Sequence, residues 1–360
     1  MTKVLIWVTF VLIIFGLVMI SSAGIYVSQK NFGTNYYYFN HQLIFGFLPG
    51  LLLFFLALKT DYKILKKISL PLILFSIGLL ILIFAPGFGI SAGGAKRWID
   101  FFGLFSFQPS EILKLALIIY LASWFGSKTK LGNKNESGSI IAFLIILFAI
   151  SIFIAAQPDI GTLGIVVSVA SVIFFCSGGR FKHFAAIILL IVIGFVLLIY
   201  LYPYGLNRLL VFLNPDLDTR GIGYHLNQSL IAIGKGGLLG VGFGQGEQKL
   251  GFLPEPVGDS IFAVIGEELG FAGMIFTVFL LLMFVVISLN IARKAGNKFA
   301  SLYAVGLASW VGLQSFVNIA SLSGMIPLTG IPLPFISYGG TSLAILMTGA
   351  GILANIARRV

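Results

Sequence analysis

Residues 253–267 read LPEPVGDSIFAVIGE, and they mark the point where a long polar loop becomes an apolar helix. Pro254 and Pro256 restrict the backbone on the approach, and Gly258 permits the last turn before the helix. Asp259 then lies where the helix begins. Free N–H groups and the helix dipole favour a carboxylate there. Asp259 therefore has two interpretations, a helix cap or a base at a membrane surface.

The composition around this stretch is that of a polytopic helical membrane protein. Hydrophobic residues form 58% of the 360-residue chain, charged residues form 10%, and the mean hydropathy is +1.05. We therefore expect an all-α fold, with one membrane domain over residues 1–360. Ten apolar stretches are long enough to span a bilayer. They cover residues 4–22, 42–58, 68–86, 107–126, 139–157, 159–177, 184–203, 260–289, 300–320 and 335–357.

The net charge of +11 follows the predicted topology. With the N-terminus inside, 15 of the 23 basic residues fall in cytoplasmic segments, whereas 10 of the 12 acidic residues fall outside or within the membrane. This asymmetry is the positive-inside pattern. It predicts cytoplasmic termini and a basic inner face in contact with anionic membrane lipids, and it argues against a nucleic-acid partner. The single cysteine, Cys176, rules out a cysteine metal cluster.

The outer loop 87–109 carries two adjacent cations, Lys96 and Arg97, on the side where cations are scarce. They indicate either a site for a pyrophosphate or another anion, or a re-entrant loop at the lipid headgroups. Glu111 and Lys114 follow at a spacing that places them on one face of the next span. Charges at membrane depth pair with each other or face a cavity. The two residues therefore fasten helices together, or they line a polar cavity.

Two further outer segments carry charge. Asp159, after Gln157 and Pro158, begins a span and lies on the same outer face as Asp259. The 56-residue segment 204–259 contains Arg208 and Arg220, and we expect a short interfacial helix within it at residues 224–233. Loops of this length are usually functional.

The end of that segment, residues 234–251, is rich in glycine and resembles a phosphate-cradling loop, but it matches no P-loop or dinucleotide fingerprint. Glu267 and Glu268 lie further along the following helix, and only Glu267 has a helical position from which it could share a cavity with Asp259. The last outer loop, residues 323–341, cannot form one regular span, so its backbone must be buried in protein or line a cavity.

Five of these stretches together resemble the SEDS proteins (shape, elongation, division and sporulation), the FtsW and RodA type of peptidoglycan polymerase, with the closer likeness to FtsW. The matching stretches are GAKRWIDFFGLFSFQPSEILKLALIIYLA (94–122), QPDIGT (157–162), NQSLIAIGKGGLLGVGFGQGEQKLGFLPE (227–255), DSIFAVIGEELGFAG (259–273) and PLTGIPLPFISYGGTS (327–342).

The resemblance implies an inverting glycosyltransferase that polymerises lipid II at the outer leaflet of the bacterial cytoplasmic membrane. Asp259 matches the family's loop aspartate, the expected general base for the acceptor hydroxyl. The family's polar cavity residues fall on Glu111 and Lys114, and its outer aspartate falls on Asp159. A class B penicillin-binding protein is the implied partner. The chain has Val257 and Gly258 where the family usually has His-Thr, so the resemblance supports no mechanism that needs that histidine.

The leaving group of such a reaction, undecaprenyl pyrophosphate, needs positive charge. The candidates are Lys96, Arg97, Arg208 and Arg220. No tightly bound cofactor is expected, and any Mg²⁺ or Mn²⁺ is expected to be bridged by the substrate. Two alternatives predict that Asp259 is dispensable: a lipid II flippase, which needs alternating access, and a structural scaffold for the penicillin-binding protein.

Overall fold

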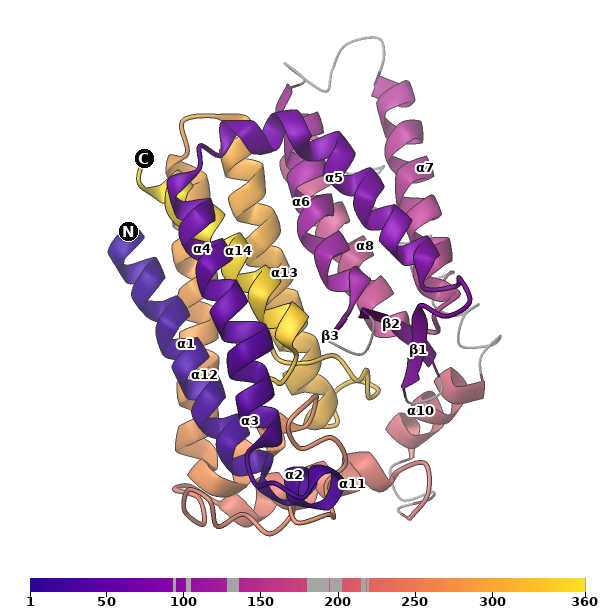
Figure 1. The fold of residues 1–360 in the computed structure, drawn as a ribbon, viewed down its shortest axis with the longest axis vertical. Coiled ribbons are helices and arrows are strands. Elements are labelled where there is room, and N and C mark those ends of the chain that lie inside the picture. Colours follow the sequence, from indigo (N-terminus) through magenta and orange to yellow (C-terminus); the bar gives the residue numbers. More distant parts are fainter. Residues whose placement is uncertain are drawn as a thin grey trace.

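The computed structural model describes residues 1–92, 95–101, 105–127, 136–179, 194, 203–214, 218 and 220–359. Most of the long helices run side by side along the long axis of the molecule, and both termini lie toward one end (Figure 1). The helices are α1 (Thr2–Ala23), α2 (Ile25–Phe32), α3 (Tyr37–Gln42), the π-helical turn η1 (Leu43–Phe47), α4 (Leu48–Lys59), α5 (Lys63–Leu82), α6 (Pro109–Ser127), α7 (Glu136–Ala155), α8 (Ile160–Cys176), α10 (Pro203–Leu213), α11 (Tyr224–Gly236), α12 (Ile261–Lys294), α13 (Lys298–Leu322) and α14 (Gly340–Ala357).

The described helices confirm a mostly helical, multi-pass membrane fold. Seven helical segments are long and apolar enough to cross a membrane, namely Thr2–Ala23, Tyr37–Lys59, Tyr62–Leu82, Pro109–Ser127, Ile261–Lys294, Lys298–Leu322 and Gly340–Ala357. The apolar parts of α7 and α8 are shorter. Each of these segments coincides with a predicted span. The predicted span at residues 184–203 lies outside the described residues.

Helix α13 lies in the interior of the bundle, where it packs against α6, α8 and α12. Its Tyr303 and Trp310 side chains are fully buried, and the Tyr303 hydroxyl donates to the carbonyl of Gly349 in α14 at 3.0 Å. A β-carbon on Gly351 of α14 would lie 2.6 Å from the carbonyl oxygen of Phe54 in α4. Small residues of this kind let membrane helices approach closely.

Helix α12 is broken at Gly270. A continuous helix of 34 residues would extend about 51 Å, well beyond a hydrocarbon core of about 30 Å. Gly270 has φ 66° and ψ −163°, which divides α12 into residues 261–269 and a membrane-length part, 271–294. The glycine-rich loop closes onto the break, because the amides of Phe271 and Ala272 donate to the carbonyls of Gly237 and Leu238.

The loop before α6 contains a small antiparallel sheet that the sequence analysis did not anticipate. Its strands are β1 (Gly89–Ala92), β2 (Ala95–Phe101) and β3 (Phe105–Phe107), in that order. Ile99 pairs with Gly89 on one side and Phe107 on the other. Ile99 is buried whereas Lys96 is exposed, so the sheet covers apolar surface and leaves this cation in solvent.

The last outer loop behaves as predicted. The stretch from Ser323 to Gly339 contains no regular helix, and its Leu333, Phe335 and Ile336 side chains are buried in protein. The final helix therefore begins at Gly340, five residues later than the apolar stretch at 335–357 suggested.

Gly270→Ala is expected to destabilise the fold. An added β-carbon would lie 2.3 Å from the amide nitrogen of Gly240 and 2.7 Å from Leu238, in a backbone conformation that costs a non-glycine residue about 1–3 kcal/mol. The midpoint of thermal unfolding in detergent measures the effect. Gly234→Ala is the matched control, because a β-carbon there meets open space. Equal unfolding midpoints for the two variants would contradict this account of the break.

Candidate active site

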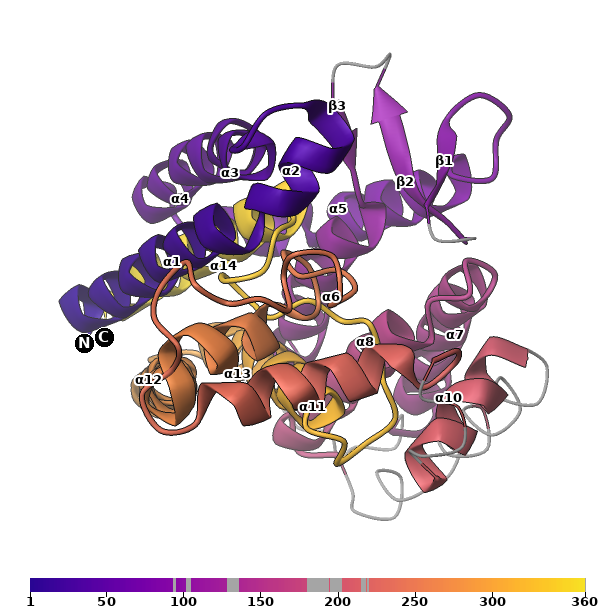
Figure 2. The same cartoon turned by 90° about the horizontal axis from the view of Figure 1, so that it is seen from below.

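A cavity of about 310 Å³ opens at the end of the bundle where α8 begins. Helices α10 and α11 lie across this end (Figure 1), and Figure 2 views it directly. Three charged side chains line the cavity, Arg97 from β2, Asp159 before α8, and Arg208 from α10. The segment 326–331 and apolar residues of α8 and α13 form most of the remaining wall.

Asp259 is not among the residues that line this cavity, but its carboxylate lies beside Gly330, which is one of them. A β-carbon on Gly330, whose φ is +70°, would lie 3.4 Å from Nη2 of Arg208 and 3.5 Å from Oδ2 of Asp259. Glycine at this position therefore leaves the space beside both charged groups open. The buried side-chain amide of Asn318 donates to the carbonyl of Asp259 at 2.8 Å and to that of Ile331 at 2.7 Å. It thereby joins the two segments that carry the site.

The surroundings of Asp259 suit a base better than a helix cap. The N-cap residue of α12 is Ser260. Burial raises the pKa of Asp259 from 3.8 to about 6, although Arg208 and the backbone N–H groups of Asp259 and Ser260 act in the opposite direction. Among the described residues, Oδ1 of Asp259 has no hydrogen-bond partner. The carboxylate is thus ionised at pH 7, yet it has a raised proton affinity and one free oxygen.

Arg97 and Asp159 lie on the opposite side of the cavity. Nε of Arg97 is 3.9 Å from Oδ2 of Asp159, and Nη2 donates to the carbonyl of Pro158 at 2.6 Å. Oδ1 of Asp159 accepts from the amide of Thr162 at 3.2 Å, so Asp159 caps α8 as its position in the sequence suggested. Arg97 remains 31% exposed, which leaves part of its guanidinium available to an anion.

Lys96 and Arg220 do not reach the cavity. Both side chains are exposed, and neither is among the cavity-lining residues. The sequence placed both cations on the correct loops, but it could not show which way their side chains point.

Glu111 and Lys114 lie inside the bundle and form a buried ion pair, with Nζ of Lys114 2.8 Å from Oε1 of Glu111. Lys114 also donates to Oε1 of Gln314 at 3.0 Å and lies 4.8 Å from the centre of the Trp310 ring. These contacts fasten α6 to α13. The pair does not line the 310 Å³ cavity, so the structure favours the fastening role over the cavity role.

Gln314 and Asn318 were not singled out from the sequence, although both contact the irregular segment that forms the cavity wall. Nε2 of Gln314 donates to the carbonyl of Pro332 at 2.9 Å, next to the Ile331 carbonyl that Asn318 binds. The two side chains are four residues apart and share a face of α13. Two amides at this spacing inside a predicted span were the available signal.

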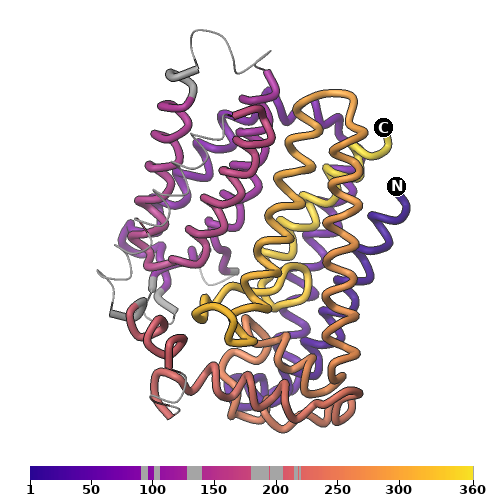
Figure 3. The backbone as a smooth tube through the Cα atoms, turned by 180° about the vertical axis from the view of Figure 1, so that it is seen from behind, coloured from indigo at the N-terminus to yellow at the C-terminus, as the bar shows by residue number. Residues whose placement is uncertain are grey.

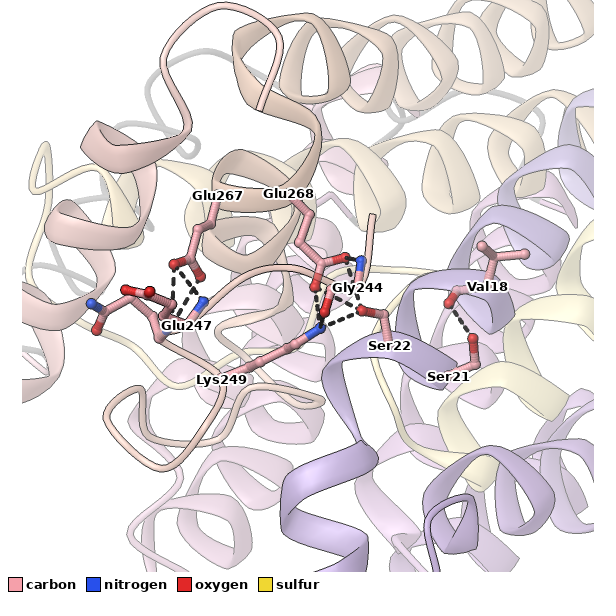
Figure 4. Close-up of polar contacts among 9 residues, drawn as sticks. Val18, Ser21, Ser22, Gly244, Glu247, Lys249, Glu267 and Glu268 are labelled. Carbon is pink, nitrogen blue, oxygen red and sulfur yellow. Dashed lines mark hydrogen bonds and ion pairs between the residues drawn. The ribbon is translucent and has the colours of Figure 1, made fainter. Parts of the chain in front are cut away.

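The glycine-rich loop, residues 234–251, contacts two carboxylates of the protein itself, those of Glu267 and Glu268 (Figure 4). Lys249 forms a buried ion pair with Glu268, and Ser22 of α1 donates to the same carboxylate at 2.7 Å. The backbone amides of Glu247 and Gln248 donate to Oε1 of Glu267 at 2.9 and 3.1 Å. Glu267 does not line the cavity, and the contacts of both glutamates hold the glycine-rich loop against α12.

This arrangement defines a polytopic membrane protein with a cavity that two arginines line and a carboxylate of raised pKa beside it. The family model that matches the chain, over residues 3–360, is the FtsW/RodA/SpoVE family of cell cycle proteins, and the chain belongs to this family. It is 38% identical to stage V sporulation protein E of Bacillus subtilis over 98% of this chain and 96% of that protein. It is 36% identical to a probable peptidoglycan glycosyltransferase FtsW of Geobacter sp. (strain M18) over 97% and 95% of the two chains.

The fold is shared with two solved structures. One belongs to a study of the structural coordination of polymerization and crosslinking by a peptidoglycan synthase complex, with a TM-score of 0.80, 24% identity, and coverage of 99% of this chain and 97% of that one. The other is the rod shape determining protein RodA of Thermus thermophilus, with a TM-score of 0.71, 24% identity, and coverage of 98% and 95%. The RodA-type polytopic fold predicted from the sequence is therefore confirmed.

Lys114→Met is expected to lower stability, because it leaves the Glu111 carboxylate buried without a countercharge, at about 3–5 kcal/mol. Thermal unfolding in detergent measures the loss, and adding Glu111→Gln should recover much of it. Lys235→Met is the matched control, since it breaks an ion pair of similar length with Glu247 that is exposed. Exposed pairs contribute little. A similar unfolding midpoint for both lysine variants would contradict the fastening role.

Proposed function

We propose that this protein is a peptidoglycan glycosyltransferase that polymerises lipid II at the outer leaflet of the bacterial cytoplasmic membrane. The observation that carries the proposal is the carboxylate of Asp259, with its raised pKa and one free oxygen, beside a cavity that contains two arginines. The family membership and the names of the curated relatives support the same activity.

In the proposed reaction, Asp259 accepts the proton of the acceptor sugar hydroxyl. The hydroxyl oxygen attacks the anomeric carbon of the donor from the face opposite the pyrophosphate, so the new glycosidic bond forms with inversion. The bond from the anomeric carbon to the pyrophosphate oxygen breaks, and undecaprenyl pyrophosphate leaves with the bonding electrons. Arg97 and Arg208 line the cavity, where their charges would stabilise the leaving group.

The remaining predicted ligands have secondary roles in this proposal. Lys96 and Arg220, which are exposed, attract the anionic substrate at long range. Asp159 holds Arg97 in place. Lys114, which is paired with Glu111, donates to Gln314, and Gln314 in turn donates to the irregular segment that forms the cavity wall. Any Mg²⁺ or Mn²⁺ would be bridged by the substrate, because the described residues contain no group of three or more His, Cys, Asp or Glu that could hold a metal ion.

The membrane orientation is part of the proposal. Both termini lie toward one end of the bundle, and the segment that carries α10, α11 and Asp259 lies at the other (Figure 3). Cytoplasmic termini, as the positive-inside pattern predicts, therefore place Asp259 on the outer side, where lipid II would present its disaccharide.

We further propose that a class B penicillin-binding protein binds through its transmembrane helix along α12 and α13. An apolar cavity of about 190 Å³ lies between these helices and is lined by Gly312, Ser315 and Phe316 among other residues of the two helices. Small residues in an apolar groove let a second helix approach closely. The solved complex that shares this fold couples polymerization to crosslinking, which supports a partner of this kind.

Asp259→Asn is expected to lower polymerisation of lipid II by about 10²–10⁴-fold without lowering the thermal unfolding midpoint at pH 7.5. Because the folded-state pKa is raised to about 6, the ionised form is disfavoured by folding above that pH, and asparagine removes this penalty. In the wild type, kcat/KM should fall as the pH drops below about 6, where the base becomes protonated. Initial rates of lipid II consumption, measured from pH 5 to 8, and thermal unfolding of both proteins at pH 7.5 test these statements.

The same variant separates the alternatives. A flippase or a scaffold would retain lipid II transport or partner activation in Asp259→Asn. Near wild-type glycan synthesis by the variant would remove Asp259 from the mechanism and would overturn the proposed reaction.

Gly312→Leu is expected to weaken binding of the penicillin-binding protein, because the new side chain occupies the groove between α12 and α13. Co-purification of the two proteins from membranes measures binding. Leu52→Phe is the control, since Leu52 of α4 is 63% exposed and lies outside this groove. Undiminished co-purification of a folded Gly312→Leu variant would exclude the groove as the docking surface.

A further inference from the structure

One half-buried histidine contacts the turn that carries Asp259. His225 lies on α11, and its Nε2 is 2.6 Å from the hydroxyl of Ser260. Ser260 is fully buried and is the N-cap residue of α12, yet its side chain makes no capping hydrogen bond. An N-cap serine ordinarily accepts a hydrogen bond from an amide in the first turn of its helix. Here the hydroxyl is turned toward the imidazole of another helix instead.

The surroundings of His225 keep its imidazole neutral. The pKa of His225 is lowered from 6.5 to about 4, chiefly by burial and also by Arg208, while Glu255 partly opposes both. A neutral ring has one donor and one acceptor nitrogen. It adds no positive charge for a pyrophosphate, and with this pKa it is a weaker proton acceptor at pH 7 than Asp259.

The contacts therefore define how the turn is held. Asn318 of α13 binds the carbonyl of Asp259, and His225 of α11 binds the side chain of the next residue. The two contacts reach the turn from different helices and leave Oδ1 of Asp259 free. Misplacement of a catalytic group by about 1 Å can cost on the order of 10²-fold in rate.

We infer that His225 is a positioning residue for the base Asp259 and acts through the hydroxyl of Ser260. This inference rests on the proposed glycosyltransferase function. The polar partner of the turn that carries Asp259 is then His225 on α11. The two residues that precede Asp259 in this chain, Val257 and Gly258, have no polar side chain.

A double-mutant cycle tests the inference. His225→Leu and Ser260→Ala should each lower kcat for lipid II polymerisation by about 10–100-fold, with KM changed less than about threefold because neither residue lines the cavity. The double variant should be no worse than the more impaired single variant, because both remove the same contact.

Conservative and control variants complete the experiment. His225→Gln can still hydrogen-bond Ser260, so its kcat should lie within about fivefold of the wild type. Its pH–rate profile should still fall below about pH 6, where Asp259 becomes protonated. Asn227→Ala, two residues along α11, should retain wild-type kcat. Thermal unfolding identifies any variant that fails to fold, and Ser260→Ala keeps the test decisive if His225→Leu is one of them.

A second readout does not depend on polymerisation. The pKa of Asp259 can be followed by infrared difference spectroscopy of its carboxyl stretch against Asp259→Asn. In His225→Leu and Ser260→Ala, this pKa should move down from about 6 toward 3.8, because a carboxylate that is no longer held is better hydrated. Arg208 and Glu255 also face this cluster, and they are unchanged in these variants.

Several results would overturn the inference: wild-type kcat in a folded His225→Leu variant, additive losses in the double variant, or an unchanged pKa of Asp259. Loss of the acid limb in His225→Gln, or equal inactivity of the Gln and Leu variants, would show that the imidazole itself takes part in proton transfer. If the wild type makes no more glycan than Asp259→Asn, the proposed function fails, and the infrared titration still decides the role of His225.

Discussion

The geometry of the site depends on the side-chain amide of Asn318, which joins two backbone carbonyls from segments far apart in the sequence. One carbonyl belongs to Asp259 and the other to Ile331, in irregular backbone that makes few regular hydrogen bonds. Backbone of this kind is stable within a membrane protein only when it is buried and its polar groups are satisfied. One buried amide therefore places the base and the cavity wall at a fixed distance from each other.

Two buried lysines among the described residues are neutralised by glutamates. Lys114 pairs with Glu111, and Lys249 pairs with Glu268, so these groups connect helices without being available to a ligand. Arg97 is only loosely paired with Asp159, at 3.9 Å. Arg97 and Arg208 line the same cavity, so the positive charges that an anion would meet there lie close together.

The sequence predicted the helical class and the described spans, because long apolar runs are local signals. The role of Asp259 stays a prediction. The sequence did not predict the sheet over β1 to β3, because residues 87–109 were interpreted as an outer loop, although the Gly93-Gly94 pair after an apolar run is a hairpin signal. It could not separate Arg97 and Arg208 from Lys96 and Arg220, because tertiary packing decides which cations face the cavity.

His225 shows why part of the site lay beyond sequence reasoning. A lone histidine on a short amphipathic helix carries no local signal, and it becomes significant only when folding brings α11 against the start of α12. The chain has Val257 and Gly258 before Asp259, where the resemblance led us to expect His-Thr. The polar side chains that contact this turn are instead His225, 35 residues before Ser260, and Asn318. Residues that are distant in the sequence therefore hold the turn, and only the fold brings them together.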